Sequence, residues 1–366
     1  MKLFKPKNTL GKHSHCNDTF RELIDIWNEH GLIEVIEADT NLVWLQNIGD
    51  ILLYDRPTLD WLDHDYKLCL FGNPNLPENN KQNLSWIFWG RHPRLLMKEY
   101  NEDKIYNTIF IGKIENIVQE LHRDNKWKYF IDFFDLKNGE ENKYTPEEYL
   151  KLLSKSKFGL CLRGYGPKCN REIELMALGV VPLITPDVSL NYYCPLIEGQ
   201  HYFKITKPED IPLIVAKCSE KKWKEMSLNC KKWYQDNCSP IGSFNTTMKI
   251  VKKNTLNSFC TIATKNVYSD LLNLLPSLEK YYPNVPINIL CDTYIQNKIK
   301  DKWKNINIYN QLDKYSDKNR KEMETDNIWV EFMLKKSDII DISLEQNYNT
   351  MFIDSDIIFL DSNLEI

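Results

Sequence analysis

Apolar runs of strand length alternate with helical patterns through the middle of the chain. Asn107–Ile111 (NTIFI) and Lys157–Leu162 (KFGLCL) read as buried strands, and Ile114–Arg123 fits a helix between them. Apolar strands that alternate with helices predict a parallel sheet that is covered on both faces. Further elements expected in this region are strands at Lys128–Phe134 and Val180–Ile184, a helix at Asn170–Leu178, and one or two closing helices within Lys207–Tyr234.

Two helix ends carry recognisable capping signals. Thr145 is followed by Pro146 and then by Glu148, the order expected of an N-cap residue, a first helical position and a capping box. Gly179 follows the periodic residues of the helix at Asn170–Leu178 and predicts its end.

The pattern differs on either side of this region. The first 104 residues hold short apolar runs separated by turn clusters, and they predict a small α/β unit. Residues 251–255 (VKKNT) are polar and predict a linker. After this stretch the alternation restarts, with strands expected at Phe259–Ala263, Pro286–Cys291 and Thr350–Ile353 and helices at Val267–Lys280 and Trp329–Glu345.

Composition and length narrow the classes of protein. The chain has 366 residues, a formal net charge of −4, and 42% hydrophobic and 27% charged residues, which excludes whole-chain disorder and coiled coil. We expect three parts, at 1–104, 105–250 and 256–366. The mild acidity argues against a nucleic-acid partner. No apolar run approaches the roughly 18–20 residues of a membrane span.

The N-terminus and the cysteines indicate the compartment. Residues 1–15 (MKLFKPKNTLGKHSH) contain basic residues but no apolar stretch, so we expect no secretory signal and a cytoplasmic location. The ten cysteines form no C-x-x-C pair and are expected to be reduced thiols rather than a disulfide framework. His13 and His15 have no carboxylate or cysteine partner at a fixed spacing, which disfavours a metal site there.

Most of the candidate chemistry lies in Phe158–Ile184. Its strand delivers a loop with Gly164 and Gly166 to the carboxyl edge of the sheet, where open α/β sheets bind ligands. The next helix starts near Asn170, and a helix N-terminus favours an anion such as phosphate. An ordinary strand–turn–helix explains the same local pattern. Positive charge comes from Arg163, Lys168 and Arg171, and Glu174 is placed to accept hydrogen bonds from ribose hydroxyls.

This stretch resembles the donor-binding half of exostosin-like glycosyltransferases, which have the GT-B fold. The matching residues are Ser156-Lys157-Phe158, Cys161-Leu162-Arg163-Gly164, Arg171, Glu174, Ala177-Leu178-Gly179 and Val181-Pro182-Leu183-Ile184. The resemblance implies a nucleotide-diphosphate sugar, a UDP- or GDP-sugar, as donor and a glycan or protein-linked acceptor. It also implies that Arg171 contacts the diphosphate and Glu174 the ribose or sugar. The donor-binding residues expected on this basis are Gly112, Lys113, Arg163, Gly164, Gly166, Lys168, Arg171 and Glu174.

The resemblance favours an inverting mechanism. Many retaining GT-B enzymes have an acidic pair at eight-residue spacing, and here the earlier positions of such a pair are Gly164 and Gly166. An inverting transferase needs a general base for the acceptor hydroxyl, which in GT-B enzymes usually comes from the N-terminal domain. Asp55 and His92 are the candidate bases, because each follows a short apolar run. Ordinary roles as a turn cap and a surface histidine remain open for them.

A second motif ends the last expected strand. Asp354 and Asp356 stand at i and i+2, on the same face of a strand, where they can ligate Mn²⁺ or Mg²⁺. A lone Asp-x-Asp is a common triplet. The region resembles the nucleotide-binding half of GT-A glycosyltransferases, in Phe259–Thr264, Ile289–Asp292, Trp329–Lys336 and Tyr348–Asp356. The resemblance implies that Thr264 and Asp292 lie near the base and the ribose.

A GT-A domain continues well beyond Asp-x-Asp, whereas only Ile357–Ile366 follow the motif in this chain. We therefore expect the third part to be catalytically incomplete, as a piece of a longer bifunctional protein or as a remnant. The predicted fold is two Rossmann-like units in a GT-B-like arrangement followed by a partial GT-A-like unit. The predicted function is an inverting glycosyltransferase, and the alternative is a nucleotide-sugar- or glycan-binding module without turnover. A phosphatase or kinase is disfavoured because no G-x-x-x-x-G-K-[ST] loop occurs.

Overall fold

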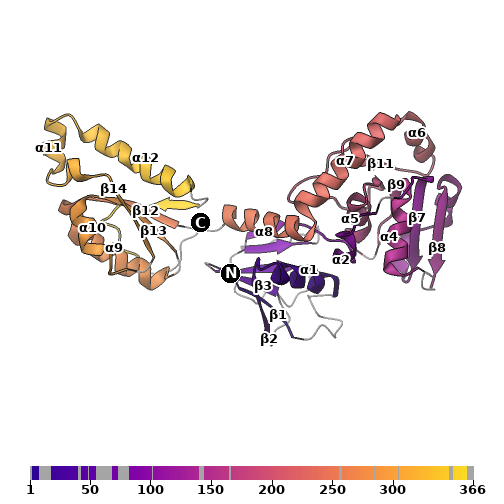
Figure 1. The fold of residues 1–366 in the computed structure, drawn as a ribbon, viewed down its shortest axis with the longest axis horizontal. Coiled ribbons are helices and arrows are strands. Elements are labelled where there is room, and N and C mark those ends of the chain that lie inside the picture. Colours follow the sequence, from indigo (N-terminus) through magenta and orange to yellow (C-terminus); the bar gives the residue numbers. More distant parts are fainter. Residues whose placement is uncertain are drawn as a thin grey trace. The chain divides into compact units, whose positions relative to one another are not determined.

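The chain divides into two compact units, Met1–Met248 (unit 1) and Lys249–Ile366 (unit 2), each described by itself. In the computed structural model (Figure 1) the described residues are 2–7, 18–39, 43–47, 49–54, 68–72, 82–100, 102–139, 144–164, 166–254, 258–283, 285–303, 305–345 and 349–360. Both units are α/β with parallel strands, which confirms the predicted fold class at this level.

Unit 1 begins with a mixed sheet in the order β2-β1-β3-β4-β5-β6. Strand β3 is antiparallel to β1 and β4, and the other neighbouring strands are parallel. The rings of Phe20 and Trp89 stack at 4.6 Å in its core, which anchors the start of the segment that leads to Arg91. The elements are β1 Lys2–Pro6, α1 Asp18–Glu29, β2 Glu34–Ala38, β3 Val43–Asn47, β4 Gly49–Tyr54, β5 Leu68–Phe71, β6 Gln82–Ser85 and α2 Pro93–Leu96.

The second sheet of unit 1 is entirely parallel, as the alternating pattern predicts, in the order β11-β10-β9-β7-β8. Its strand order reverses between β7 and β9, so this pair forms a topological switch point. Its strands are β7 Tyr106–Ile114, β8 Phe133–Asn138, β9 Ser156–Cys161, β10 Val181–Ile184 and β11 Phe203–Lys204. Its helices are α3 Ile117–His122, η2 Asn125–Phe130, α4 Pro146–Ser154, α5 Asn170–Ala177, α6 Asp210–Lys217 and α7 Glu220–Asn237.

Local signals account for several of these boundaries. The Thr145 side chain accepts from the Glu148 backbone N–H and the Glu148 carboxylate accepts from the Thr145 N–H, which confirms the capping box. Gly179, at φ +66°, ends α5 as predicted, because this left-handed conformation suits glycine. The expected closing helices are α6 and α7.

Two expectations were wrong. The strand expected at Lys128–Phe134 is a 3₁₀ helix up to Phe130, because the Asp124 side chain caps it by accepting from the Lys126 N–H at 2.8 Å; the strand β8 begins only at Phe133. The linker expected at 251–255 is helical up to Asn254, as the last turn of α8 (Pro240–Asn254). Lys252 and Lys253 in that turn complement the negative end of the helix dipole, so the polar residues suit a helix terminus.

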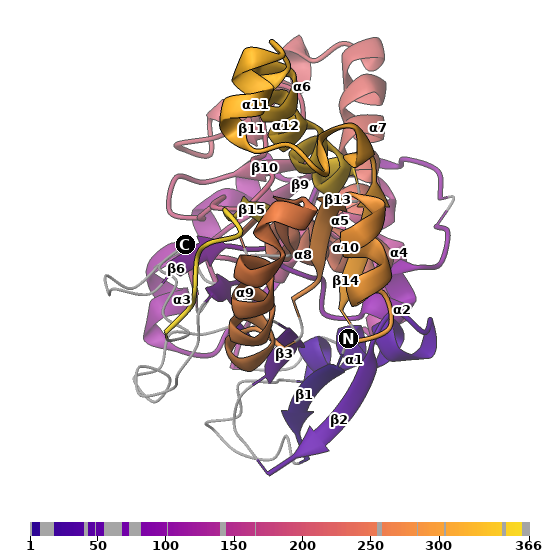
Figure 2. The same cartoon turned by 90° about the vertical axis from the view of Figure 1, so that its left-hand side faces the viewer.

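Unit 2 holds a parallel sheet in the order β14-β13-β12-β15, with its switch point between β12 and β15. Neighbouring residues of β12 face opposite ways: Phe259 contacts Tyr282 at 5.1 Å, and Cys260 packs with Ile339 of α12. Helices α9 and α12 accordingly cover opposite faces (Figures 1 and 2). The elements are β12 Ser258–Ala263, η3 Lys265–Val267, α9 Tyr268–Tyr281, β13 Ile287–Cys291, α10 Thr293–Ile299, β14 Ile306–Asn310, η4 Asp313–Tyr315, α11 Arg320–Thr325, α12 Trp329–Glu345 and β15 Thr350–Phe352.

Candidate functional site

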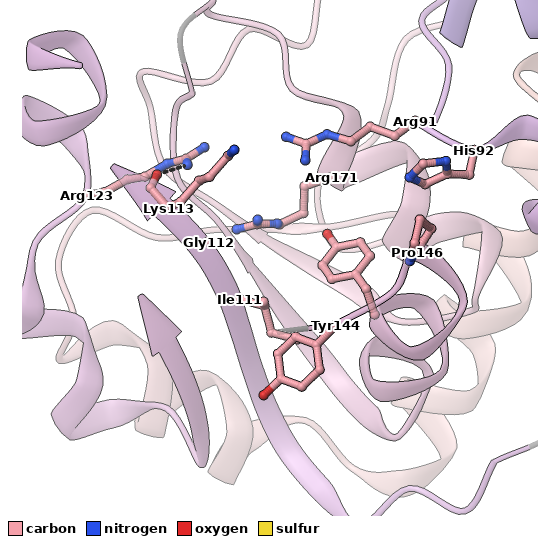
Figure 3. Close-up of a pocket in the computed structure, with 10 residues that line it drawn as sticks. Arg91, His92, Ile111, Gly112, Lys113, Arg123, Tyr144, Pro146 and Arg171 are labelled. Carbon is pink, nitrogen blue, oxygen red and sulfur yellow. Dashed lines mark hydrogen bonds between the residues drawn. The ribbon is translucent and has the colours of Figure 1, made fainter. Parts of the chain in front are cut away.

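A cavity of about 220 Å³ opens at the carboxyl end of β7 in unit 1 (Figure 3). Gly112 and Lys113 of β7 form one part of its wall and Arg171 of α5, the helix after β9, forms another. The cavity therefore lies at the switch point of the parallel sheet, where ligands bind in open α/β folds. The residues that line it are Arg91, His92, Ile111, Gly112, Lys113, Arg123, Tyr144, Pro146, Tyr149 and Arg171.

The charged side chains that line this cavity are all basic. Arg91, Lys113, Arg123 and Arg171 come from four different segments, and none of the described residues in the wall is acidic. Lys113 also pairs with the Glu115 carboxylate, which does not line the cavity. The remaining repulsion among the four cations is relieved by a bound anion. The wall is therefore suited to a multiply charged anion.

Arg171 lies at the centre of this arrangement (Figure 3). Its guanidinium carbon lies 4.6 Å from the centroid of the Phe110 ring. Gly112, two residues along β7, leaves room for this stack, because a Cβ there would lie 2.8 Å from Phe110 Cζ. Nε and Nη1 of Arg171 are buried and have no hydrogen-bond partner among the described residues. Buried guanidinium donors of this kind are normally satisfied, so they point to a ligand.

Arg123 is held rigidly beside Arg171. Its side chain donates from Nη1 to the Lys113 carbonyl at 2.6 Å and from Nε to the Arg163 carbonyl at 3.1 Å. These two carbonyls lie at the ends of β7 and β9, so the guanidinium bridges the switch point. Burial, together with the neighbouring charge of Arg171, lowers the pKa of Arg123 to about 10, which still leaves it charged at neutral pH.

Glu174 has a different place from the one expected. It is 1% exposed and does not line the cavity. Its Oε2 accepts a hydrogen bond from the Tyr149 hydroxyl at 2.8 Å, and its Oε1 accepts one from the backbone N–H of Arg91 at 3.0 Å. In this structure Glu174 therefore positions two residues of the wall, and nothing places it at a ribose.

The described residues of the glycine loop also make contacts within the protein rather than with the cavity. The N–H of Gly164 donates to Cys169 Sγ at 3.1 Å, and the Cys169 N–H donates to the Glu172 carboxylate at 2.9 Å. Lys168 is 6% exposed and its ammonium lies 4.4 Å from the centroid of the Tyr192 ring. Of the expected donor-binding residues, Gly112, Lys113 and Arg171 line the cavity, whereas Arg163, Gly164, Gly166, Lys168 and Glu174 do not.

One candidate base lies in the wall. His92 precedes α2 as its N-cap residue, without a side-chain cap hydrogen bond, and lines the cavity. Asp55, His13 and His15 lie outside the described residues. Sequence reasoning missed Arg91 and Arg123 as site residues: Arg91 adjoins a chosen histidine, but Arg123 carries no local signal because its partners come from two different strands.

In unit 2, Asp292 has a structural role. It is completely buried; Oδ1 accepts from the Ile295 N–H at 2.8 Å and caps α10, and Oδ2 accepts from the Lys265 N–H at 2.7 Å and the Ser316 hydroxyl at 2.6 Å. Thr264, at the end of β12, is 4% exposed. Neither side chain is presented as an open ligand group.

Asp354 and Asp356 follow β15 at the switch point of the unit 2 sheet. Asp354 Oδ1 accepts from Lys336 Nζ of α12 at 2.6 Å. No group of three or more His, Cys, Asp or Glu side chains suited to a metal ion occurs within the part of the chain that the structure describes. As arranged, these residues do not fit a Mn²⁺ or Mg²⁺ site, because a lysine ammonium occupies the first carboxylate and a third ligand is missing among the described residues.

In comparisons with known proteins, neither a family model nor a curated sequence matches this chain. Among the described helices, none combines the length and the apolar character that crossing a bilayer requires.

Proposed function

We propose that unit 1 is a nucleotide-sugar-dependent glycosyltransferase of the GT-B type, and that the cavity at the carboxyl end of β7 binds the diphosphate of the donor. The observation that carries this proposal is Arg171, whose buried Nε and Nη1 face an otherwise cationic wall without a partner among the described residues. The exostosin-like motif that contains Arg171 supports a nucleotide sugar as the source of the anion. Arg123 and Lys113 share the charge of the diphosphate, and departure of a diphosphate is favoured in such a surrounding.

The experiment is isothermal calorimetry of the full chain with a panel of UDP, GDP, UDP-sugars and GDP-sugars. We expect one nucleotide class to bind and Arg171→Ala to weaken its affinity at least about 100-fold, the cost of leaving a diphosphate without a buried charged partner. Arg320→Ala is the matched control, because Arg320 is an arginine of unit 2 that pairs with Glu324 on the surface. Unchanged affinity in Arg171→Ala would refute the assignment of this cavity.

The alternative is a binding module without turnover. It is favoured by one observation, namely that the described wall of the cavity contains no carboxylate that could act as a base. The two functions differ in a single measurement, the release of free nucleotide diphosphate from the donor that binds. We propose that unit 2, which resembles the first half of a GT-A domain, contributes no turnover. This is supported by the ion pair of Asp354 with Lys336 and by the lack of a group of three metal ligands among the described residues.

A further inference from the structure

A histidine and a carboxylate lie in contact at the carboxyl edge of the parallel sheet of unit 1. Nδ1 of His122 lies 2.5 Å from Oδ2 of Asp187. Both side chains are partly accessible, at 24% and 29% exposure. No hydrogen bond joins His122 Nε2 to another of the described residues.

His122 adjoins a residue of the proposed donor site along the chain, although neither His122 nor Asp187 itself lines the cavity. His122 is the last residue of α3 and directly precedes Arg123, which lines the cavity and bridges the carbonyls of Lys113 and Arg163. Asp187 lies three residues after the end of β10, and Thr185 between them donates from its hydroxyl to the Cys161 carbonyl at 3.1 Å. The contact therefore joins two segments that pass over the carboxyl ends of β7, β9 and β10.

The chemistry of such a pair is specific. A carboxylate at Nδ1 holds the imidazole in the tautomer that carries its proton on Nδ1, so the lone pair of Nε2 is available, and it stabilises the imidazolium that forms when Nε2 takes a proton. His92, which lines the cavity directly, has no side-chain hydrogen bond at the start of α2. Of the two histidines, His122 is the one with a side-chain partner among the described residues.

We propose that His122, positioned by Asp187, is the general base of the transfer reaction; this inference rests on the proposed function. Nε2 takes the proton of the acceptor hydroxyl while the hydroxyl oxygen forms a bond to the anomeric carbon of the donor. The bond from that carbon to the diphosphate oxygen breaks, and its electron pair leaves with the nucleotide diphosphate. Asp187 is a positioning residue and does not accept the proton. Water in place of the acceptor gives slow hydrolysis by the same step.

The test uses the full chain and measures release of UDP or GDP from the donor that binds in calorimetry, with water as the acceptor. We expect His122→Asn to lower turnover by at least about 100-fold, since its amide keeps a hydrogen bond to Asp187 but cannot take a proton. We expect Asp187→Asn to lower turnover about 10-fold or more through loss of the imidazole orientation. Affinity for the free nucleotide diphosphate should stay within about twofold in both variants, which separates a base from a binding residue.

Three further variants make the result decisive. His30→Asn, at an exposed histidine that follows α1, is the matched control and should keep full turnover. In His122→Gly, added imidazole should restore part of the turnover, an effect that a purely structural histidine would not show. Turnover that persists in His122→Asn, or is lost in His92→Asn alone, overturns the proposal and assigns the base elsewhere.

Failure of the proposed function has a different signature. A wild-type chain that binds no nucleotide diphosphate refutes the donor site and the base together. A wild-type chain that binds the nucleotide but releases none from any donor refutes the transferase and its base, keeps the donor site, and supports the binding module. Wild-type turnover that persists in His122→Asn refutes the base alone.

Discussion

The hydroxyl of Tyr149 donates a 2.8 Å hydrogen bond to Oε2 of Glu174, and this contact ties α4 to α5 beneath the cationic cavity. The second oxygen of the same carboxylate accepts from the backbone N–H of Arg91. Burial, with the Glu174 carboxylate beside it, raises the pKa of Tyr149, so the phenol remains a donor across the accessible pH range. One buried carboxylate thus holds three segments that form the wall.

We expect Glu174→Ala to destabilise unit 1 by about 2–4 kcal/mol, because it leaves the Tyr149 hydroxyl and the Arg91 N–H without acceptors in a buried place. Tyr149→Phe should cost only about 1 kcal/mol, since it removes one hydrogen bond. Urea unfolding curves measure both. Glu147→Ala, at an exposed glutamate that pairs with Lys98, is the control and should change the free energy of unfolding by less than about 1 kcal/mol. Equal values for Glu174→Ala and the control would contradict the structural role.

The stack of Arg171 on Phe110 predicts an effect on binding without any change of charge. We expect Phe110→Leu to weaken the affinity for a nucleotide diphosphate roughly 10-fold, because a buried cation–π contact is worth about 1–2 kcal/mol and its loss frees the guanidinium to move. Calorimetry measures the affinity. Phe133→Leu on the neighbouring β8, where the ring packs against Tyr106, is the matched control and should bind as the wild type does. A normal affinity in Phe110→Leu would show that the stack does not orient Arg171.

The raised pKa of the Glu172 carboxyl predicts how the stability of unit 1 depends on pH. Its carboxyl is completely buried, and burial raises its pKa from 4.5 to about 7. Between these two values the folded chain keeps the proton that the unfolded chain has released. Stability therefore falls as the pH rises through this window, by roughly 1.4 kcal/mol per unit and about 3 kcal/mol in all.

Glu172→Gln stays neutral and should lack this component of the pH dependence. The free energy of unfolding of the wild type minus that of the variant is expected to fall between pH 4.5 and about 7 and to be flat on either side. Urea titrations at several pH values give the difference directly. A difference that does not change with pH would mean that the Glu172 carboxyl has the same pKa in the folded and the unfolded chain.

Gly159 in β9 packs directly against α5. A Cβ at this position would lie 2.4 Å from Cδ2 of Leu175, a buried residue of α5, so we expect Gly159→Ala to cost about 1–3 kcal/mol by overpacking. At Gly166 the nearest atom to a Cβ would be the Lys168 carbonyl oxygen at 3.6 Å, which makes Gly166→Ala the matched control with little effect. Thermal unfolding of both variants tests this. A larger loss of stability in Gly166→Ala than in Gly159→Ala would contradict the overpacking at Gly159.

Unit 2 should not bind a divalent ion tightly. Because Lys336 occupies Asp354, titration of the full chain with Mn²⁺ is expected to show no saturable binding below about 1 mM. Lys336→Met, which frees the carboxylate, is the informative variant, and any affinity that it gains should disappear when Asp354→Asn is added. Tight binding by the wild type, lost in Asp354→Asn, would show that Asp354 ligates a divalent ion despite its pairing with Lys336.

Features governed by neighbours in the sequence could be predicted. The parallel sheet of unit 1 follows from apolar runs separated by helical patterns, and the start of α4 follows from Thr145, Pro146 and Glu148. The helix α12 was predicted with the bounds that the structure has. Where a local signal competed with another, prediction was wrong, as at 128–130, where the cap from Asp124 favours a 3₁₀ turn over a strand.

The sequence by itself determined the class of fold and the presence of a basic, glycine-containing loop followed by a helix that bears Arg171. Only the tertiary structure decided which residues meet. It brought Arg91 and Glu174 together across 83 positions, paired Arg123 with carbonyls of two strands, and set His122 against Asp187. The physical reason is the separation along the chain over which each kind of interaction acts. Helix and strand preferences depend on residues within a few positions, whereas a site at a switch point is assembled by packing between segments that are far apart in the chain.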